Sequence, residues 1–241
     1  MAEARNTALV VSAHAADFVW RAGGAIALYA GRGWTVKIVC LSYGERGESA
    51  KLWREPGMTL ERVKADRRRE SQAAADVLGA EVDFFDCGDY PLRVSDDALS
   101  RLADLYQSLQ PAFVLTHANE DPYNVDHPRA AQVAQEARVI AQAHGHRPGG
   151  AVLGAPGVFL FEPHQPEQCR FKPDVLLDIT SVWEKKRKAF ELMAAQQHLW
   201  EYYTRVALNR GVQAARNSNM KDIKYAEAYQ RVFPQVTDVL S

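Results

Sequence analysis

The chain alternates short runs of apolar residues with longer segments whose apolar positions follow the period of a helix. The apolar runs predict strands at Thr7–Ser12, Thr35–Leu41, Val82–Asp86, Phe113–Thr116, Gly157–Phe161 and Val175–Asp178. The longer segments predict helices at Asp17–Arg32, Thr59–Leu78, Asp96–Leu109, Pro128–Ala143 and Ser181–Gln196. Because this alternation is typical of βαβ units, the sequence predicts an α/β fold built on a mostly parallel sheet.

We expect a single domain that spans residues 1–241. Hydrophobic residues make up 47% of the 241 residues, which is enough to bury a substantial core. The chain contains no internal repeat, no low-complexity tract and no linker rich in Pro, Gly or Ser. Nothing in the sequence therefore indicates a boundary between two domains.

The charge balance and the cysteine content limit which partners the protein can bind and where in the cell we expect it. The 29 Lys and Arg residues nearly balance the 30 Asp and Glu residues, so no global field favours nucleic acid or an anionic membrane. Cys40, Cys87 and Cys169 are too scattered for a disulfide framework or a Cys-x-x-Cys metal site. The N-terminus leads into the first apolar run without a leader, and no run approaches the length of a membrane span. We therefore expect a soluble, cytoplasmic protein.

A histidine and an aspartate three residues apart, His14 and Asp17, stand where the first predicted strand gives way to a helix. An α/β protein places its chemistry at this kind of position. A second histidine, His127, follows a later predicted strand. Together the three side chains suit a catalytic Zn²⁺ that keeps one position open, and Zn²⁺ is the cofactor that we expect. Two histidines and one carboxylate also suit Mn²⁺ or Fe²⁺, so these alternatives stay open.

Polar loops follow three of the predicted strands and should lie at the same edge of the sheet as His14. They span Ser42–Met58, Asn119–Asp126 and Glu162–Glu167. Long loops at the carboxyl ends of strands commonly carry binding and catalytic residues. These loops are therefore the place to look for further site residues.

Several motifs resemble those of the LmbE-like, or PIG-L, zinc deacetylases of N-acetylglucosamine conjugates. The matching motifs are His14-x-x-Asp17 with Gly23-Gly24, the helix pattern Arg67, Glu70, Ala74, Leu78-Gly79, the strand end Thr116-His117, and Asp126-His127. The resemblance implies a Rossmann-like three-layer sandwich with helices on both faces of the sheet. It also implies that His14, Asp17 and His127 are the metal ligands.

Two positions that handle protons in the deacetylases differ in this chain. The family's general-base aspartate falls on Ala16, and the first histidine of its His-Pro-Asp-His motif falls on Asn124. A metal site without its hydrolytic base still needs a proton carrier from another loop at the same edge. We choose Glu48 and His164 as the catalytic residues. Glu45 and Asp126 remain alternatives to them.

Further segments resemble the hydratase branch of this family, the 4-oxalomesaconate hydratases of bacterial gallate and protocatechuate breakdown. The matching segments are Ser42–Trp53, Phe161–Cys169, His198–Arg205 and Arg210–Ala214. The resemblance implies addition of water to the C=C bond of 4-oxalomesaconate, which gives 4-carboxy-4-hydroxy-2-oxoadipate. Glu48 would take a proton from the attacking water, and His164 would supply or shuttle a proton at the enolate. The metal could polarise a carbonyl oxygen or activate the water, and this choice stays open.

The implied substrate is a small tricarboxylate, which needs cationic and polar partners. We expect it to be bound by Arg46, Lys51, Arg54, Asn124, Arg205 and Arg210. Arginine suits this role because a guanidinium group binds a carboxylate through two parallel hydrogen bonds. We expect no nucleic-acid or membrane partner, and we expect the chain to form a homo-oligomer.

Two other functions stay open. The first is a true N-acyl deacetylase in which Glu48 or Asp126 replaces the missing aspartate at position 16. The second is a non-catalytic, metal-dependent binding module, which a ligand would stabilise without turnover. Loss of a conjugated oxo-acid, compared with release of acetate from N-acetylglucosamine, separates the two enzymes.

Overall fold

The protein is described by a computed structural model that covers residues 6–220 and 222–238. Across these residues the strands form one seven-stranded sheet with the order β3-β2-β1-β4-β5-β7-β6. The strands are β1 (Thr7–Ser12), β2 (Thr35–Cys40), β3 (Glu81–Phe84), β4 (Phe113–Thr116), β5 (Gly157–Phe161), β6 (Val175–Asp178) and β7 (Ala226–Arg231). The pairs from β3 to β5 are parallel, whereas β7 runs antiparallel to both of its neighbours. The predicted α/β fold with a mostly parallel sheet is confirmed.

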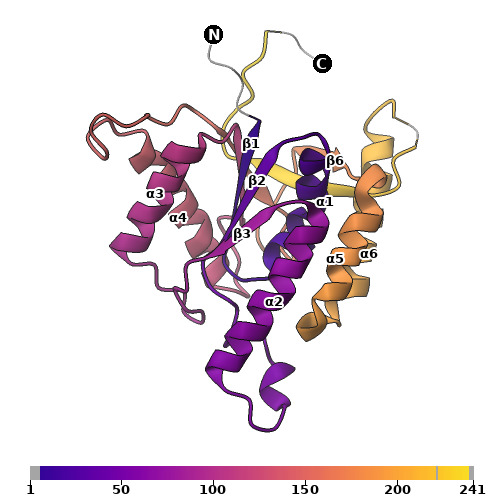
Figure 1. Cartoon of the computed structure of the whole chain (residues 1–241). Coiled ribbons are helices and arrows are strands. Elements are labelled where there is room, and N and C mark those ends of the chain that lie inside the picture. Colours follow the sequence, from indigo (N-terminus) through magenta and orange to yellow (C-terminus); the bar gives the residue numbers. More distant parts are fainter. Residues whose placement is uncertain (1–5, 221, 239–241) are drawn as a thin grey trace.

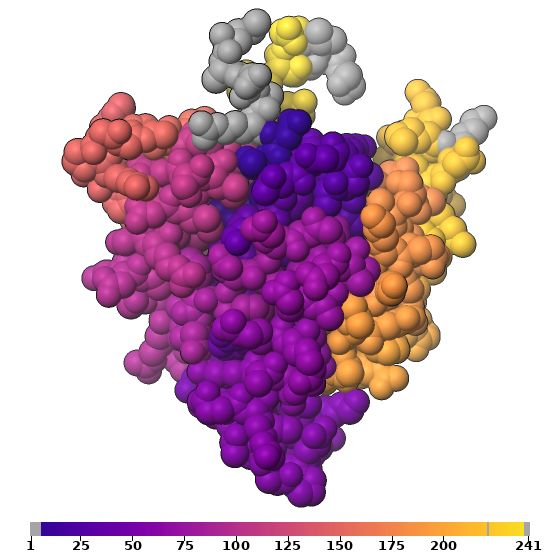
Figure 2. Space-filling model, viewed as in Figure 1, coloured from indigo at the N-terminus to yellow at the C-terminus, as the bar shows by residue number. Residues whose placement is uncertain are grey.

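Helices cover both faces of this sheet (Figure 1). One face carries α1 (Asp17–Gly31), α2 (Leu60–Leu78) and α5 (Trp183–Leu192), and the other carries α3 (Asp96–Leu109) and α4 (Asp126–Ala141). Helix α6 (Leu199–Arg216) packs on β6, β7 and α5. In the space-filling view, α5 lies directly against α2, and the segment between β2 and α2 projects below them (Figure 2). The three layers that the resemblance implied are therefore present.

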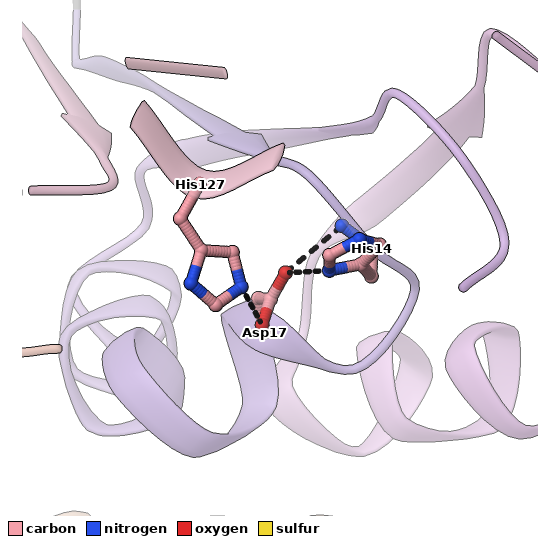
Figure 3. Close-up of side chains that lie close together, drawn as sticks. All are labelled: His14, Asp17 and His127. Carbon is pink, nitrogen blue, oxygen red and sulfur yellow. Dashed lines mark hydrogen bonds and ion pairs between the residues drawn. The ribbon is translucent and has the colours of Figure 1, made fainter. Parts of the chain in front are cut away.

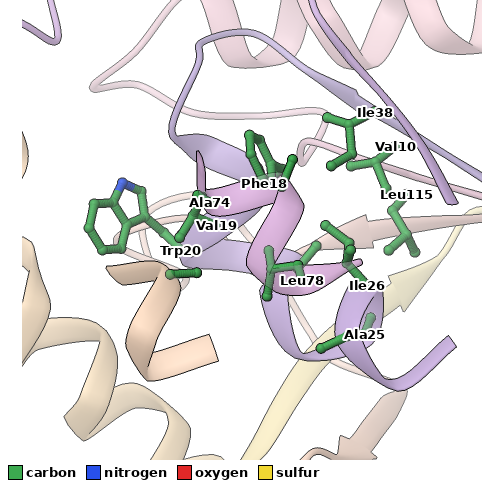
Figure 4. Packing of buried hydrophobic residues seen from close by; sticks show 14 of the residues in the cluster. Val10, Phe18, Val19, Trp20, Ala25, Ile26, Ile38, Ala74, Leu78 and Leu115 are labelled. Carbon is green, nitrogen blue, oxygen red and sulfur yellow. The ribbon is translucent and has the colours of Figure 1, made fainter. Parts of the chain in front are cut away.

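The strand β1 is buried on both faces. Ala8 and Val10 belong to the core under α1, α2 and α5, which Figure 4 shows around Phe18 and Leu78. Leu9 and Val11 point the other way, into the core under α3 and α4. Successive side chains of a strand point to opposite faces, so a strand between two helix layers has to be apolar throughout. This requirement explains the continuous apolar run in the sequence.

The strand order reverses between β1 and β4. The chain runs outward from β1 to β2 and β3, and then returns to form β4 on the other side of β1. In open α/β sheets, ligands bind beyond the carboxyl ends of the strands at such a switch point. His14 follows β1 and His117 follows β4, so the fold brings both histidines to this point.

The predicted elements differ from the structure mainly after Phe161. Helix α5 ends at Leu192, four residues short of the predicted end, and a separate 3₁₀ turn follows at Ala194–Gln196. No element was predicted beyond Gln196, where the structure has α6 and β7. Elsewhere the bounds shift by one or two residues. Among the helices and turns of the described chain, none combines the length and apolar character needed to cross a bilayer.

Candidate metal centre and active site

Three buried side chains, His14, Asp17 and His127, converge at the switch point (Figure 3). Their potential ligand atoms all lie within 4.8 Å of one another. Asp17 lies between the two rings, with Oδ2 3.2 Å from Nδ1 of His14 and Oδ1 3.5 Å from Nε2 of His127. His14 occupies the turn after β1, Asp17 is the first residue of α1, and His127 is in the first turn of α4. The fold thus brings the three predicted ligands together.

Two ring nitrogens in this cluster are buried without a hydrogen-bond partner in the described part of the chain. They are Nδ1 of His14 and Nε2 of His127, the two atoms that face Asp17. Leaving a buried polar atom unsatisfied costs about 1–3 kcal/mol. Neutral imidazole nitrogens and a carboxylate oxygen are donors that Zn²⁺ and related divalent ions prefer. These residues therefore fit a divalent metal ion.

The other ring nitrogen of each histidine contacts a carboxylate. Nε2 of His14 is 3.1 Å from Oδ2 of Asp126, and Nδ1 of His127 is 2.7 Å from Oδ2 of Asp121. Contacts of this kind set the tautomer and orientation of a ring, so that its remaining nitrogen faces the metal site. Burial would lower the pKa of His14, but the neighbouring carboxylates of Asp126 and Asp17 outweigh it and raise that pKa to about 10.

Asp126 has further partners that hold it in place. Its carboxylate accepts hydrogen bonds from the backbone N–H groups of Tyr90 and Leu92, at 2.8 Å and 2.7 Å. Burial alone would raise the pKa of Asp126, but these bonds and the one to His14 lower it. Its oxygens are thus committed to orienting His14, although the sequence left Asp126 open as an alternative base.

His117 lies beside the ligands at the end of β4. Its Nε2 accepts a hydrogen bond from the backbone N–H of Ala13 at 2.9 Å and lies 3.3 Å from Oδ2 of Asp17. The ring stacks on His127 with 4.3 Å between the ring centroids. Burial lowers the pKa of His117 to about 3, so the ring is neutral at neutral pH. The ring of His117 thus packs against His127 and lies close to Asp17.

Glu48 reaches the site from the loop that follows β2. Its Oε1 lies 4.0 Å from Nδ1 of His14. The loop follows a tight path here, because Gly44 has a φ of +66° and a Cβ on it would lie 2.9 Å from Cβ of Glu48. A Cβ on Gly47 would lie 2.0 Å from the ring of Tyr90. These two glycines allow the loop to bring Glu48 close to the ligands.

Both carboxylate oxygens of Glu48 accept hydrogen bonds from neutral side chains. Oε1 accepts from the hydroxyl of Tyr90 at 3.1 Å and from Nδ2 of Asn124 at 3.0 Å. Oε2 accepts from Nε2 of Gln196 at 2.8 Å. Burial and the nearby Glu48 raise the pKa of Tyr90, so its hydroxyl stays a proton donor. Glu48 is thus a carboxylate held on both oxygens beside His14.

The amide of Asn124 has one possible orientation in this arrangement. Its Oδ1 accepts from the backbone N–H of Asp126 at 3.1 Å, so its Nδ2 faces Glu48 and the hydroxyl of Tyr90. A backbone N–H can only donate, which forces the amide oxygen toward it. Asn124, predicted to bind substrate, therefore lies directly against Glu48.

Comparison with known proteins agrees with this geometry. The family model for GlcNAc-PI de-N-acetylases, PIG-L, matches residues 9–138. The chain belongs to the PIG-L family. A curated relative, the 4-oxalmesaconate hydratase of Pseudomonas putida, is 62% identical over 240 residues, which cover 98% of this chain and 93% of the relative. The resemblance inferred from the motifs is confirmed.

Solved structures show the same relationship. The crystal structure of GalB, the 4-carboxy-2-hydroxymuconate hydratase of Pseudomonas putida, matches with a TM-score of 0.96 and 63% identity, covering 98% of this chain and 99% of GalB. The N,N'-diacetylchitobiose deacetylase of Pyrococcus horikoshii matches with a TM-score of 0.78 and 22% identity, covering 94% and 84% of the two chains. The second match is a likeness of fold.

Ala16 is 2% exposed and directly precedes Asp17, and its methyl side chain cannot carry a proton. The alternative base Glu45 is fully buried inside the loop after β2, where its Oε2 accepts from the backbone N–H of Tyr43 at 3.2 Å. Oε1 of Glu48 lies near Nδ1 of His14, the nitrogen that faces Asp17, whereas Asp126 contacts the opposite nitrogen of the same ring.

His164 lies in the loop after β5, between two tyrosines of α6. Its ring stacks on Tyr202 with 4.0 Å between centroids and meets Tyr203 edge-on at 6.0 Å. The hydroxyl of Tyr202 donates to the backbone carbonyl of His164. Burial lowers the pKa of His164, and the positive charge of Arg21 adds to this effect. The negative charges of Asp121 and Glu48 act in the opposite direction and raise it.

A groove of about 710 Å³ opens beside Glu48. Two of the basic residues predicted to bind substrate, Lys51 and Arg54, line it together with Gln196 and His198. Lys51 donates to the backbone carbonyl of Ala194 at 3.1 Å across the groove. Two cationic side chains therefore line the same groove as Glu48.

The other three predicted basic residues have partners elsewhere. Arg46 donates to the backbone carbonyl of Asp89 and helps to hold the loop. Arg205 is exposed on α6 and pairs with Glu201. Arg210 donates to the carboxylate of Glu162 through Nε and Nη2. Their predicted role in binding substrate stays a prediction.

Sequence reasoning missed two residues of the site, Arg21 and Gln196. Arg21 is 7% exposed, with Nε 3.6 Å from Oδ1 of Asp17 and Nη1 donating to the carbonyl of Glu162 at 2.9 Å. Its position four residues after Asp17 on one helix was a usable signal, since such residues share a face. Gln196 had no signal, because it stood at the end of a predicted continuous helix.

Proposed function

We propose that this protein is a metal-dependent hydratase that adds water to the C=C bond of 4-oxalomesaconate. The product is 4-carboxy-4-hydroxy-2-oxoadipate. The observation that carries the proposal is the 62% identity to a 4-oxalmesaconate hydratase over 98% of the chain. The substrate after which GalB is named, 4-carboxy-2-hydroxymuconate, is the enol form of the same tricarboxylate. The site accords with this reaction, because the cluster that could bind a metal has the carboxylate of Glu48 beside it, on the loop after β2.

His14, Asp17 and His127 would hold the metal, and Zn²⁺ is the ion that we propose. A divalent ion supplies a Lewis acid there, which favours negative charge on a substrate oxygen or the ionisation of water. Asp126 and Asp121 hold the two rings so that their unpartnered nitrogens face Asp17, where a bound ion would find them.

Glu48 takes a proton from the attacking water. Its Oε1 lies 4.0 Å from a ligand nitrogen of His14, and contacts with Tyr90, Asn124 and Gln196 keep the carboxylate in place. The oxygen of water then bonds to one alkene carbon, and the electron pair of the C=C bond moves toward its conjugated carbonyl group. A base held next to the reaction centre contributes about 10²–10⁴-fold to such a step.

His164 relays a proton from solvent to the second alkene carbon, which completes the addition. Its ring is held by stacking on Tyr202, in a loop after β5 at the same edge of the sheet as the loop that carries Glu48. One proton leaves water at Glu48 and one arrives from His164, so the enzyme returns to its starting state when the two groups exchange a proton through solvent. No other bond of the substrate breaks.

The carboxylates of the substrate need positive partners, and the groove beside Glu48 offers them. Lys51 and Arg54 line this groove, and we propose that they bind substrate carboxylates. Asn124 is close enough to Glu48 to contact the substrate as well as the base. A buried guanidinium, that of Arg21, lies on the Asp17 side of the site.

The assignments for the whole molecule are also proposals. The sheet takes in strands from Thr7 to Arg231, which supports a single domain over residues 1–241. We propose that the protein works in the cytoplasm, where a catabolic hydratase meets its substrate, and that it forms a homo-oligomer. Size-exclusion chromatography with light scattering tests the last point.

The decisive experiment is an assay of the purified protein on 4-oxalomesaconate. We expect the absorbance of the conjugated oxo-acid to disappear, and we expect treatment with a chelator to abolish this activity until a divalent metal is restored. Release of acetate from N-acetylglucosamine without hydration would contradict the proposal and favour a deacetylase. Stabilisation by the oxo-acid without any turnover would favour a binding module.

The metal assignment has a readout that does not depend on activity. His14→Ala or Asp17→Ala should remove the bound metal, as measured by elemental analysis of the purified variants. His144→Ala is a matched control, because that side chain is exposed and far along the chain from the cluster. One full equivalent of metal in the first two variants would reject these ligands.

A further inference from the structure

We propose that Gln196 is a positioning residue for Glu48 and that Arg67 sets the orientation of its amide. The inference rests on the proposed function, in which Glu48 takes the proton from water. It adds a series of contacts that runs from α2 through the 3₁₀ turn Ala194–Gln196 to Glu48. These contacts reach Oε2 of Glu48, whereas Oε1 is the oxygen that lies near His14.

The amide of Gln196 connects a cation to a carboxylate. Its Oε1 accepts from Nη2 of Arg67 at 2.9 Å, and its Nε2 donates to Oε2 of Glu48 at 2.8 Å. A guanidinium group has donors only, and a carboxylate accepts. The amide oxygen must therefore face Arg67, and the amide nitrogen must face Glu48. The contacts themselves exclude the flipped amide.

Arg67 cannot easily move away from this position. Its side chain is 0% exposed, and Nη1 pairs with Oε2 of Glu70 at 2.7 Å. Its Nε donates to the backbone carbonyl of Tyr43 at 3.4 Å, in the loop that also carries Glu48. A buried guanidinium that lost these partners would leave an uncompensated charge in the core. Arg67 is thus a fixed point from which Gln196 is oriented.

The backbone around Gln196 is fixed as well. The N–H of Ala195 donates to Oε1 of Glu70 at 2.9 Å, so Glu70 holds both Arg67 and the turn. Lys51 donates to the carbonyl of Ala194 from the opposite side. The side chain of Ala195 packs in a small apolar cluster with Leu52 and Val63. The turn is therefore tied to α2 and to the loop after β2.

This arrangement matters because Glu48 stands on a loop. Oε1 has to face the metal ligands, and it lies 4.0 Å from Nδ1 of His14. A bond to Oε2 from a fixed amide stops the carboxylate from rotating about its last bond. Misplacing a reacting group by about 1 Å can cost about 10²-fold in rate. Loss of Gln196 should therefore slow the reaction while leaving the ligands intact.

The first test is Gln196→Met, which keeps the length of the side chain but removes both amide contacts. We expect kcat to fall about 10-fold or more, KM to change less than about 3-fold, and the metal content to stay at the wild-type level. Gln72→Met is the matched control, since Gln72 is exposed on α2 and bonds only to Asp76 in the described contacts. A wild-type kcat for Gln196→Met would overturn the proposal.

A second variant covers the case in which Gln196→Met does not fold. Gln196→Glu can still accept from Arg67, but its carboxylate has no N–H to donate to Glu48. We expect the same loss of kcat with normal metal content. A wild-type kcat in this variant would also overturn the proposal.

A double-mutant cycle separates positioning from a general structural effect. In a Glu48→Gln background the base is already gone, so adding Gln196→Met should lower kcat by less than about 3-fold. A full additional loss would show that Gln196 acts elsewhere and would overturn the inference. Normal turnover by Glu48→Gln alone would instead reject Glu48 as the base, and this inference with it. The cycle thus shows which of the two proposals has failed.

Discussion

Oε1 of Glu48 lies 4.0 Å from Nδ1 of His14, the ring nitrogen that faces the metal site. The two residues follow β2 and β1, which are parallel neighbours in the sheet, so their carboxyl ends meet at one edge. Ala16, buried beside Asp17, has no group that could carry a proton. The proposed base therefore follows β2, whereas His14, Ala16 and Asp17 follow β1.

Removing this carboxylate tests its role directly. Glu48→Gln keeps the shape of the side chain but cannot take a proton, so we expect kcat to fall by about 10²–10⁴-fold. The metal content should stay unchanged, because Glu48 is not one of the three ligands. Steady-state kinetics and elemental analysis measure the two quantities. Glu55→Gln, an exposed change in the same loop, should behave as wild type, and near-normal turnover of Glu48→Gln would contradict the assignment.

Asp126→Asn should weaken metal binding without removing a ligand. The aspartate accepts from His14 and from two backbone N–H groups, and it orients the ring. Losing a contact of this kind typically costs 10- to 100-fold in metal affinity, and we expect a loss in this range. Competition with a chromophoric chelator measures the affinity. Asp97→Asn, on the exposed first turn of α3, is the control, and equal affinities for the two variants would speak against the role of Asp126.

Gly44→Ala should both destabilise the protein and displace Glu48. Gly44 has a φ of +66°, and its Cβ would approach that of Glu48 to 2.9 Å. Left-handed backbone costs an L-residue about 1–2 kcal/mol, and the close approach adds to this cost. Gly31→Ala is the control, because no atom lies within 4 Å of its Cβ position. The free energy of unfolding, measured by urea denaturation, and kcat should both fall for Gly44→Ala but not for Gly31→Ala. A Gly44→Ala variant as stable as Gly31→Ala would refute this expectation.

His164 should make the protein less stable in acid. Burial lowers the pKa of His164 in the folded chain, while the unfolded chain has an ordinary histidine pKa of about 6.5. Below that value the unfolded state binds the proton more readily, so the free energy of unfolding falls as the pH drops toward the folded pKa. Well above a pH of about 6.5, the contribution of His164 to the free energy of unfolding no longer changes with pH.

Urea denaturation of wild type and His164→Gln at about pH 7.5 and about pH 5 tests this sign. The variant should lose less stability between the two values than the wild type. His144→Gln, which changes an exposed histidine, should match the wild type. A variant that loses as much stability as the wild type would show that His164 does not contribute.

Local patterns in the sequence predicted most of the sheet. The strands β1, β4, β5 and β6 begin and end where the apolar runs do. For β1 and β4 the reason is that parallel strands between two layers of helices have to be apolar on both faces. Strand β7 was not predicted, because polar residues interrupt its sequence, Ala226-Glu-Ala-Tyr-Gln-Arg231. Glu227 is nevertheless buried, and it accepts from Lys186, from Tyr229 and from the backbone N–H groups of Gly24 and Ala25. Partners from other elements cannot be read from a strand's own pattern.

The candidate site shows the same division. His14, Asp17 and His127 could be predicted because strand ends and short spacings are local features. The contacts of Gln196 could not, because they depend on α5 ending at Leu192 and on a turn tied to Glu70, more than a hundred residues earlier. Likewise, whether a basic residue faces the groove, as Lys51 does, or an acidic neighbour, as Arg210 does, is decided by tertiary packing.

The position of β7 has a consequence for how the chain is made. The last strand of the described sheet inserts between β5 and β6, and β6 has no other strand beside it. During synthesis on the ribosome, β6 therefore emerges about fifty residues before the strand that satisfies its backbone. Until Ala226–Arg231 has left the exit tunnel, β5 presents an open edge that could pair with another chain. A message cut short before β7 would thus yield a product prone to aggregation, even though His14, Asp17 and His127 had already been translated.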